Sequence, residues 1–167
     1  MTANNLRRID LDLIEPNFLE RVMAVIAKCS ARGAEYHAIA GHRTYGAQMA
    51  LWAAGRTKPG NKVTNAKGGQ SAHCFGIAID FVHDSNPGMQ GLQPDWVPSN
   101  YKILQEEVEL AGLHSGASYH DLPHVSLPGY VTAAQLLPLH LAWEKSQDSG
   151  GDTLTRLKQV WQVLNHG

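Results

Sequence analysis

One stretch of the chain decides its fold, and it reads Ser71-Ala72-His73-Cys74-Phe75-Gly76-Ile77-Ala78-Ile79-Asp80. It pairs a histidine with an aspartate seven residues later, across a glycine. A second element follows about forty residues on, and it reads Asp121-Leu122-Pro123-His124. Together the two elements supply two imidazoles and a carboxylate, with a further carboxylate three residues before the second histidine.

The spacing of the first element requires a break in the backbone. In an unbroken strand, residues seven apart point to opposite faces, so His73 and Asp80 would not meet. Gly76 lies between them, and a bulge or turn that glycine permits resets the alternation. Beyond it, apolar side chains share one face that suits a core packed under helices: Ile77, Ile79 and Phe81. Asp80 then faces the other side, where the small Ala78 leaves room for a site.

The ligand types indicate a catalytic metal. Two histidines and one carboxylate leave a tetrahedral zinc with an open fourth position, which is typical of catalytic sites. Zinc lowers the pKa of its bound water to about 7 and polarises a carbonyl. Asp121 is then the candidate to take the water proton and pass it to the leaving amine. The pattern predicts a hydrolase in which one zinc ion is held by His73, Asp80 and His124.

Composition narrows the class of protein. The 167 residues form one domain by length, and the apolar fraction of 43% excludes wholesale disorder. A net charge of −1 argues against a nucleic-acid partner, since affinity driven by phosphate contacts needs a basic excess. Two cysteines, Cys29 and Cys74, cannot form a disulfide framework. Nine histidines with so few cysteines favour nitrogen and oxygen ligands.

Targeting signals are not expected. Residues 1–16 carry charges and no long apolar stretch, so they do not resemble a signal peptide. The apolar stretch 131–143 is interrupted and falls short of the roughly 20 residues that span a bilayer. We therefore expect synthesis in the cytoplasm without a signal peptide, and no membrane partner.

The periodicities predict an α+β fold, with a small, mainly antiparallel sheet, helices on one face and the zinc site on the other. Helices are expected over 16–29, 47–54, 101–111 and 153–165. Strands are expected over 37–40, 77–82 and 124–127, with loops over 56–70 and 84–100 and a linker over 146–152. We expect a zinc domain over 1–130 and a helical C-terminal extension over 131–167 that packs on it or is tethered to it.

The Ser-x-His-x6-Asp and Asp-x-x-His elements resemble the family of zinc D-Ala-D-Ala carboxypeptidases and L-alanyl-D-glutamate endopeptidases, which includes many phage endolysins. The resemblance covers residues 36–127. Further positions follow the endolysin-type spacing: Arg43-Thr44, Gln48, Leu51, Gly55-Arg56-Thr57, Pro59-Gly60, Val63-Thr64, Ala66 and Gly69. The segment 113–119 departs from the family by lacking its Trp-rich pattern.

The resemblance implies the same zinc ligands and a catalytic carboxylate at Asp121. It also implies that Arg43 and Ser71, with Gln48, hold a substrate carboxylate or the polarised carbonyl oxygen, a role that suits a guanidinium fork. The expected activity is that of an endolysin-like peptidoglycan peptidase. It would hydrolyse the L-Ala–D-Glu bond of the stem peptide by a zinc-activated water, with Asp121 as general base. We expect a monomer that acts on the cell wall or periplasm after release from the cell.

Three alternatives stay open. The chain could be a D,D-carboxypeptidase or dipeptidase that releases D-Ala, or a non-catalytic zinc module that binds the cell wall. Iron(II) oxygenases also use two histidines and a carboxylate, although their first pair is usually His-x-Asp. Within the motif, His120 is the one rival to His124 as a ligand, because it adjoins Asp121.

Overall fold

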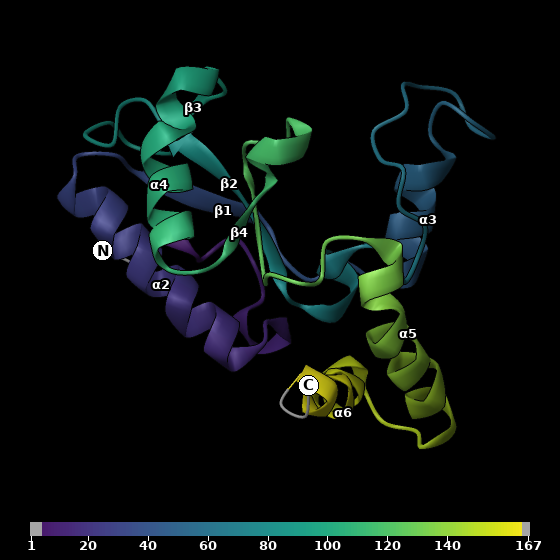
Figure 1. The fold of residues 1–167 in the computed structure, drawn as a ribbon. Helices are drawn as coiled ribbons and strands as arrows, with labels where there is room; N and C mark the ends of the chain where they lie inside the picture. Colours follow the sequence, from purple (N-terminus) through teal and green to yellow (C-terminus); the bar gives the residue numbers. More distant parts are fainter. Residues whose placement is uncertain (1–4, 165–167) are drawn as a thin grey trace.

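The structure is a computed structural model that describes residues 5–164 (Figure 1). Its longer elements are α2 (Pro16–Ala31), β1 (Tyr36–Ala40), α3 (Tyr45–Ala53), β2 (Ala78–Asp84), β3 (Pro94–Asp95), α4 (Lys102–Leu110), β4 (His114–Ser115), β5 (His124–Ser126), α5 (Ala133–Asp148) and α6 (Thr153–Leu164). Four short 3-10 helices join them: η1 (Leu11–Leu13), η2 (Ala72–Phe75), η3 (Pro98–Tyr101) and η4 (Gly116–Tyr119).

A small antiparallel sheet forms the centre of the fold. Its strands run in the order β1-β2-β5-β4, with β3 paired to the end of β2, and every pairing is antiparallel. Helices α2 and α4 lie on one side of the sheet, while α3 stands on the other side of the molecule (Figure 1). The α+β class with a small antiparallel sheet is therefore confirmed.

The main core lies where α2 and α4 meet the sheet. Helix α2 begins at Pro16, a residue suited to the first helical position, and the Glu15 side chain accepts a hydrogen bond from the Phe18 backbone at 2.6 Å. Its buried stripe packs into this core: Phe18, Val22, Val25, Ile26 and Cys29. Ile79 and Phe81 of β2 are fully buried against it, as the alternation predicts, whereas Ile77 is buried in a second core instead.

A second core joins the C-terminal helices to the segment before β2. Leu136 and Leu139 of α5 and Val160 of α6 are buried with the residues around Phe75. The expected linker over 146–152 is wrong in its first part, because α5 continues to Asp148. Ser146 is buried and donates to the Trp143 carbonyl at 2.6 Å, which satisfies its hydroxyl inside the helix.

Within residues 5–164, no helix combines the length and apolar content needed to cross a membrane.

Gly76 makes the break that the spacing requires. It ends η2 in the left-handed conformation, with φ of 66°, and β2 begins two residues later. A Cβ at this position would clash with the Leu13 carbonyl oxygen, so the site demands glycine for space as well as for conformation. His73 therefore lies on a 3-10 turn rather than on the strand, and it is free to share a site with Asp80.

We expect Gly76→Ala to lower the free energy of unfolding by about 3 kcal/mol or more, since it adds a backbone clash to the left-handed strain. Urea denaturation followed by circular dichroism measures this loss. The matched control is Gly33→Ala, where φ is 79° but a Cβ would meet nothing within 4 Å. That variant should lose only about 1 kcal/mol. Equal losses in the two variants would contradict the role of the Leu13 contact.

Candidate metal centre

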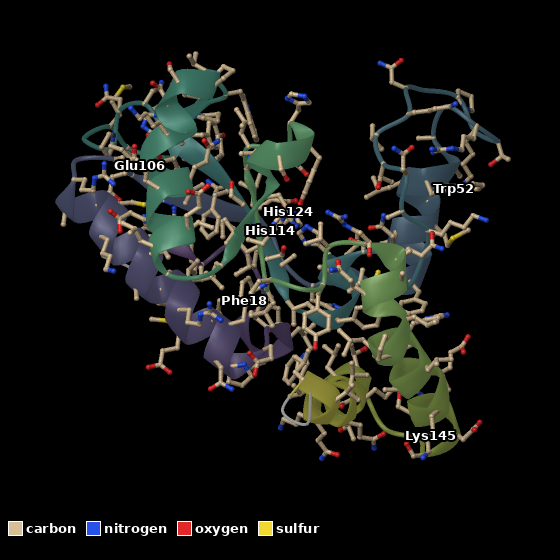
Figure 2. The ribbon with its side chains drawn as sticks, viewed as in Figure 1. Phe18, Trp52, Glu106, His114, His124 and Lys145 are labelled. Carbon is tan, nitrogen blue, oxygen red and sulfur yellow. The ribbon has the colours of Figure 1, made fainter. Side chains whose placement is uncertain are left out.

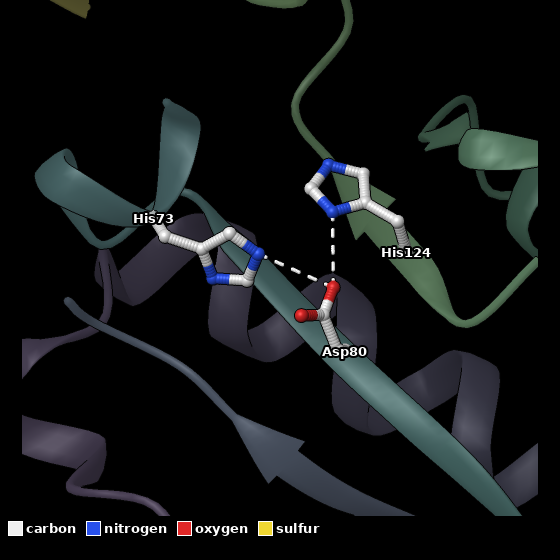
Figure 3. A group of neighbouring side chains, drawn as sticks. All are labelled: His73, Asp80 and His124. Carbon is white, nitrogen blue, oxygen red and sulfur yellow. Dashed lines mark hydrogen bonds and ion pairs between the residues drawn. The ribbon is translucent and has the colours of Figure 1, made fainter. Parts of the chain in front are cut away.

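Three side chains from separate elements meet above the sheet (Figure 3). His73 comes from η2, Asp80 from β2 and His124 from β5. The Asp80 Oδ1 lies 3.2 Å from the His73 Nε2 and 3.0 Å from the His124 Nδ1. Asp80 and His124 are register partners across β2 and β5, so the sheet itself sets them side by side. One ligand atom from each residue lies within 4.8 Å of the others.

The His73 ring is held in the orientation that a metal needs. Its Nδ1 lies 2.8 Å from the Gly41 carbonyl oxygen, which can only accept a hydrogen bond. The Nδ1 therefore carries a proton, and the Nε2, which faces Asp80, is the nitrogen that can bind a metal once its own proton has left. Metal-bound histidines are commonly oriented by such a bond from their second nitrogen. Because His73 is buried, the orientation is also fixed by packing.

The Asp80 carboxylate stays ionised. Its burial acts to raise its pKa, but the charges and hydrogen bonds of His73 and His124 outweigh burial and hold the pKa well below its usual range. The Arg43 Nη2 lies 3.9 Å from the Asp80 Oδ2 and adds a nearby positive charge. An ionised carboxylate at neutral pH is the form that binds a metal cation.

The donor set fits a metal of the zinc type. Two imidazole nitrogens and one carboxylate oxygen converge on one point, which matches three protein ligands with a fourth position left for water or substrate. They open on a cleft of about 720 Å³. Among residues 5–164, His120 lies in the wall of this cleft but outside the ligand group, so it does not displace His124.

Arg43 reaches the site through the turn between β1 and α3. Its backbone N–H donates to the His73 carbonyl at 3.0 Å, and its guanidinium lines the cleft. The Arg43 Nη1 donates to the Gln48 Oε1 at 2.9 Å. Gln48 is only 1% exposed and its amide nitrogen donates to the Ala66 carbonyl, so Gln48 lies behind the arginine rather than in the cleft.

Ser71 and Asp121 both line the cleft. Ser71 is the N-cap residue of η2, yet its side chain makes no capping hydrogen bond, so its hydroxyl is not used to start that helix. The protein atoms packed around the Asp121 carboxyl group, together with the charge of Asp80, raise its pKa. A raised pKa makes Asp121 a stronger base than an ordinary aspartate.

Sequence reasoning missed Tyr119, which also lines the cleft. Its ring lies 6.0 Å from the His124 ring and stacks on His114 at 5.9 Å. Burial and the charges of Asp121 and Asp80 raise the pKa of its hydroxyl. The signal in the sequence is an aromatic residue two positions before Asp121, in a turn too irregular for a periodicity argument.

Two of the remaining histidines have partners that the sequence did not suggest. His37 lies 3.4 Å from Asp84, and His140 lies 2.9 Å from the Tyr45 hydroxyl. His166 lies outside the described residues. Both of these paired histidines lie outside the ligand group, as does His83, which lies 3.3 Å from Asp95.

The C-terminal helices brace the turn that carries His73. The ring of Tyr45 on α3 stacks on His140 and Trp143 of α5, at 5.7 and 5.4 Å. A Cβ on Gly69 would clash with the His140 ring, so α5 sits directly on the backbone two residues before Ser71. The Trp161 Nε1 of α6 donates to the Phe75 carbonyl at 2.7 Å. Helices α5 and α6 therefore support the segment that carries Ser71 and His73.

An open three-ligand centre beside a free carboxylate and an arginine is the arrangement of a metal-dependent hydrolase. Comparisons with known proteins agree. The profile of a family described as VanY, D-alanyl-D-alanine carboxypeptidase, matches residues 12–121. The peptidoglycan L-alanyl-D-glutamate endopeptidase CwlK of Bacillus subtilis (strain 168) is 30% identical over 122 residues, which are 68% of this chain and 73% of that protein.

A solved structure supports the fold. The L-Ala D-Glu endopeptidase ChiX of Serratia marcescens matches with a TM-score of 0.52 at 19% identity, over 75% of this chain and 85% of that one. The chain belongs to the VanY family of D-alanyl-D-alanine carboxypeptidases and related peptidoglycan endopeptidases. The resemblance in the motifs and the prediction of a metallopeptidase are thereby confirmed.

We expect Asp80→Asn to weaken zinc binding by more than about 100-fold, because losing a direct ligand should exceed the cost of losing an outer partner. Isothermal titration calorimetry of the metal-free protein measures the affinity, and the unaltered chain should bind one equivalent. Asp95→Asn is the matched control, since Asp95 pairs with His83 at 3.3 Å outside the ligand group. Unchanged affinity in Asp80→Asn would exclude this centre.

Proposed function

We propose that this protein is a zinc-dependent peptidoglycan peptidase that hydrolyses the L-Ala–D-Glu bond of the stem peptide. The observation that carries the proposal is the group of His73, Asp80 and His124 at the floor of a cleft that also exposes Asp121. The choice of bond is supported by two similar proteins, CwlK and ChiX, whose names describe L-alanyl-D-glutamate endopeptidases.

The proposed ligands of the single zinc ion are the His73 Nε2, the Asp80 Oδ1 and the His124 Nδ1. A bound zinc would lower the pKa of a water and polarise the scissile carbonyl. Asp121 then accepts a proton from the attacking water and delivers it to the amine that leaves. The packed surroundings of Asp121 and the neighbouring Asp80 charge raise the pKa of its carboxyl group, which favours the first of these steps.

Arg43 is proposed to bind a substrate carboxylate or the carbonyl oxygen as it gains charge. Gln48 serves this role indirectly, because its hydrogen bond fixes the direction of the guanidinium. Ser71 is proposed to donate its hydroxyl hydrogen to the substrate. Its place at the cleft wall and its missing cap bond support that use.

We further propose that residues 1–130 form the peptidase unit and that 131–167 form an extension packed on it. The second core, shared by α5, α6 and the residues around Phe75, supports this arrangement. In the biological role that the motifs suggest, this protein is a monomeric phage endolysin that is made in the cytoplasm. After release it degrades the wall, which makes it a bacteriolytic enzyme.

One alternative function is favoured by a specific observation. The matching family is described as a D-alanyl-D-alanine carboxypeptidase, so the same site could release D-Ala instead. Both reactions place a carboxylate-bearing peptide beside Arg43, and the geometry of the metal centre serves both. The product of the reaction therefore decides between them.

Digestion of purified peptidoglycan followed by mass spectrometry tests the proposal. We expect new fragments ending in L-Ala and beginning with D-Glu, their loss with a chelator, and their return with added zinc. Release of free D-Ala would favour the carboxypeptidase. Binding to the wall without any cleavage by the zinc-loaded protein would favour a non-catalytic module, and oxygen consumption with bound iron would favour an oxygenase.

We expect Asp121→Asn to lower kcat on a soluble muropeptide by about 100-fold or more, since general base catalysis contributes on that scale. Zinc affinity should be kept, because Asp121 is outside the ligand group. Steady-state kinetics and calorimetry measure the two quantities. Asp148→Asn, an exposed position at the end of α5, is the control and should leave both unchanged. A full rate in Asp121→Asn would remove Asp121 from the mechanism.

A further inference from the structure

The charges of the chain are unevenly divided. Residues 36–79 hold five of its fourteen lysines and arginines and none of its fifteen acidic residues. The five are Arg43, Arg56, Lys58, Lys62 and Lys67. The rest of the chain holds nine cations against fifteen acids, so it is net negative. The net charge of the whole chain is near zero, although residues 36–79 are strongly basic.

The basic segment forms one wall of the cleft. Helix α3 and the loop that follows it stand opposite β4 and β5, and Trp52 marks this wall in Figure 2. The segment Val63 to Ala66 lines the cleft, and Lys62 and Lys67 bracket it in sequence. A polymer strand entering the cleft from this side passes close to both lysines.

The lysines of this loop are available to a ligand. Lys58, Lys62 and Lys67 are exposed. Within residues 5–164, no carboxylate lies within 4 Å of the charged nitrogens of these three lysines or of Arg56. Elsewhere, by contrast, Arg32 is paired with Glu106 and Glu107.

Two of the five basic side chains, Arg56 and Lys67, are held in place. The Arg56 Nη1 donates to the carbonyls of Trp52 and Thr64, at 2.7 and 2.9 Å. The Arg56 guanidinium and the Lys67 ammonium both lie over the Trp52 ring, at 5.0 and 4.9 Å from its centre. These contacts order the loop before any ligand arrives, which lowers the entropy cost of binding.

We propose that the lysine loop, defined as Lys58, Lys62 and Lys67, docks the protein on insoluble peptidoglycan by binding carboxylates of stem peptides next to the one being cut. This inference rests on the proposed function, because it extends the same substrate beyond the cleft. Each exposed ammonium–carboxylate contact is weak in water, but a mesh that repeats carboxylates offers many at once. Attraction over a Debye length of about 8 Å also draws the basic wall of the cleft toward the mesh.

The test compares two triple variants with the same net charge. Lys58→Gln, Lys62→Gln and Lys67→Gln together remove the lysine loop. Lys28→Gln, Lys145→Gln and Lys158→Gln remove three exposed lysines on α2, α5 and α6. Both sets are made in the full chain with zinc and in an Asp121→Asn background, so that the mesh stays intact. Binding is measured by co-sedimentation with sacculi stripped of lipid and of wall phosphate polymers.

We expect the loop variant to bind sacculi about fivefold to tenfold more weakly at low salt, and the control variant to stay within about twofold. When the carboxylates of the sacculi have been converted to amides, the protein with an intact lysine loop should bind them as weakly as the loop variant does. Equal losses in the two variants, no loss in the loop variant, or unchanged binding to amidated sacculi would overturn the proposal. The proposal would also be overturned if the protein bound only sacculi that keep their wall phosphate polymers, or if it bound anionic lipid vesicles and not stripped sacculi.

A separate measurement isolates the proposed function. With Asp121 intact, the loop variant should cleave a soluble muropeptide with unchanged kcat/KM, because none of its three lysines lines the cleft. A large loss there would also count against docking as the role of the loop. If even the unaltered chain cleaves no muropeptide, the proposed function fails, while the sedimentation results still decide the docking.

Discussion

Two ring nitrogens, one from His73 and one from His124, converge on a single carboxylate oxygen of Asp80, and the rest of the structure serves that convergence. An ionised carboxylate under partial burial is costly unless cations or donors compensate it. Here the two histidines compensate it, as the low pKa of Asp80 reflects. The same three atoms are then placed to exchange that mutual contact for a shared metal ion.

Several features outside the site bring these three side chains together. Antiparallel pairing of β2 with β5 sets Asp80 opposite His124, and Gly76 turns the preceding backbone so that His73 can reach the same face. The Gly41 carbonyl fixes the ring of His73. Helices α5 and α6 then pack behind η2 and keep this turn in place, which gives the C-terminal region a part in the site without adding a ligand.

The cleft has two unlike walls, and this difference shapes the proposed recognition. One wall carries Tyr119 and Asp121 near the metal centre, where chemistry is expected. The other carries Arg43 close to the ligands and the lysine loop farther out. A substrate rich in carboxylates would thus meet positive charge before it meets the general base. The overall charge of −1 hides this polarity completely.

Local sequence patterns predict much of this structure. Helix α2 starts at Pro16 as predicted and ends two residues later than expected, because a buried stripe and a proline are signals carried by neighbouring residues. The ligand types and the need for a break at Gly76 follow from spacing alone. Tertiary structure decided what depends on distant partners: Gln48 lies behind Arg43, Tyr119 enters the cleft, and α5 runs past the expected start of the linker. Those outcomes rest on packing between segments far apart in the chain, which no local pattern encodes.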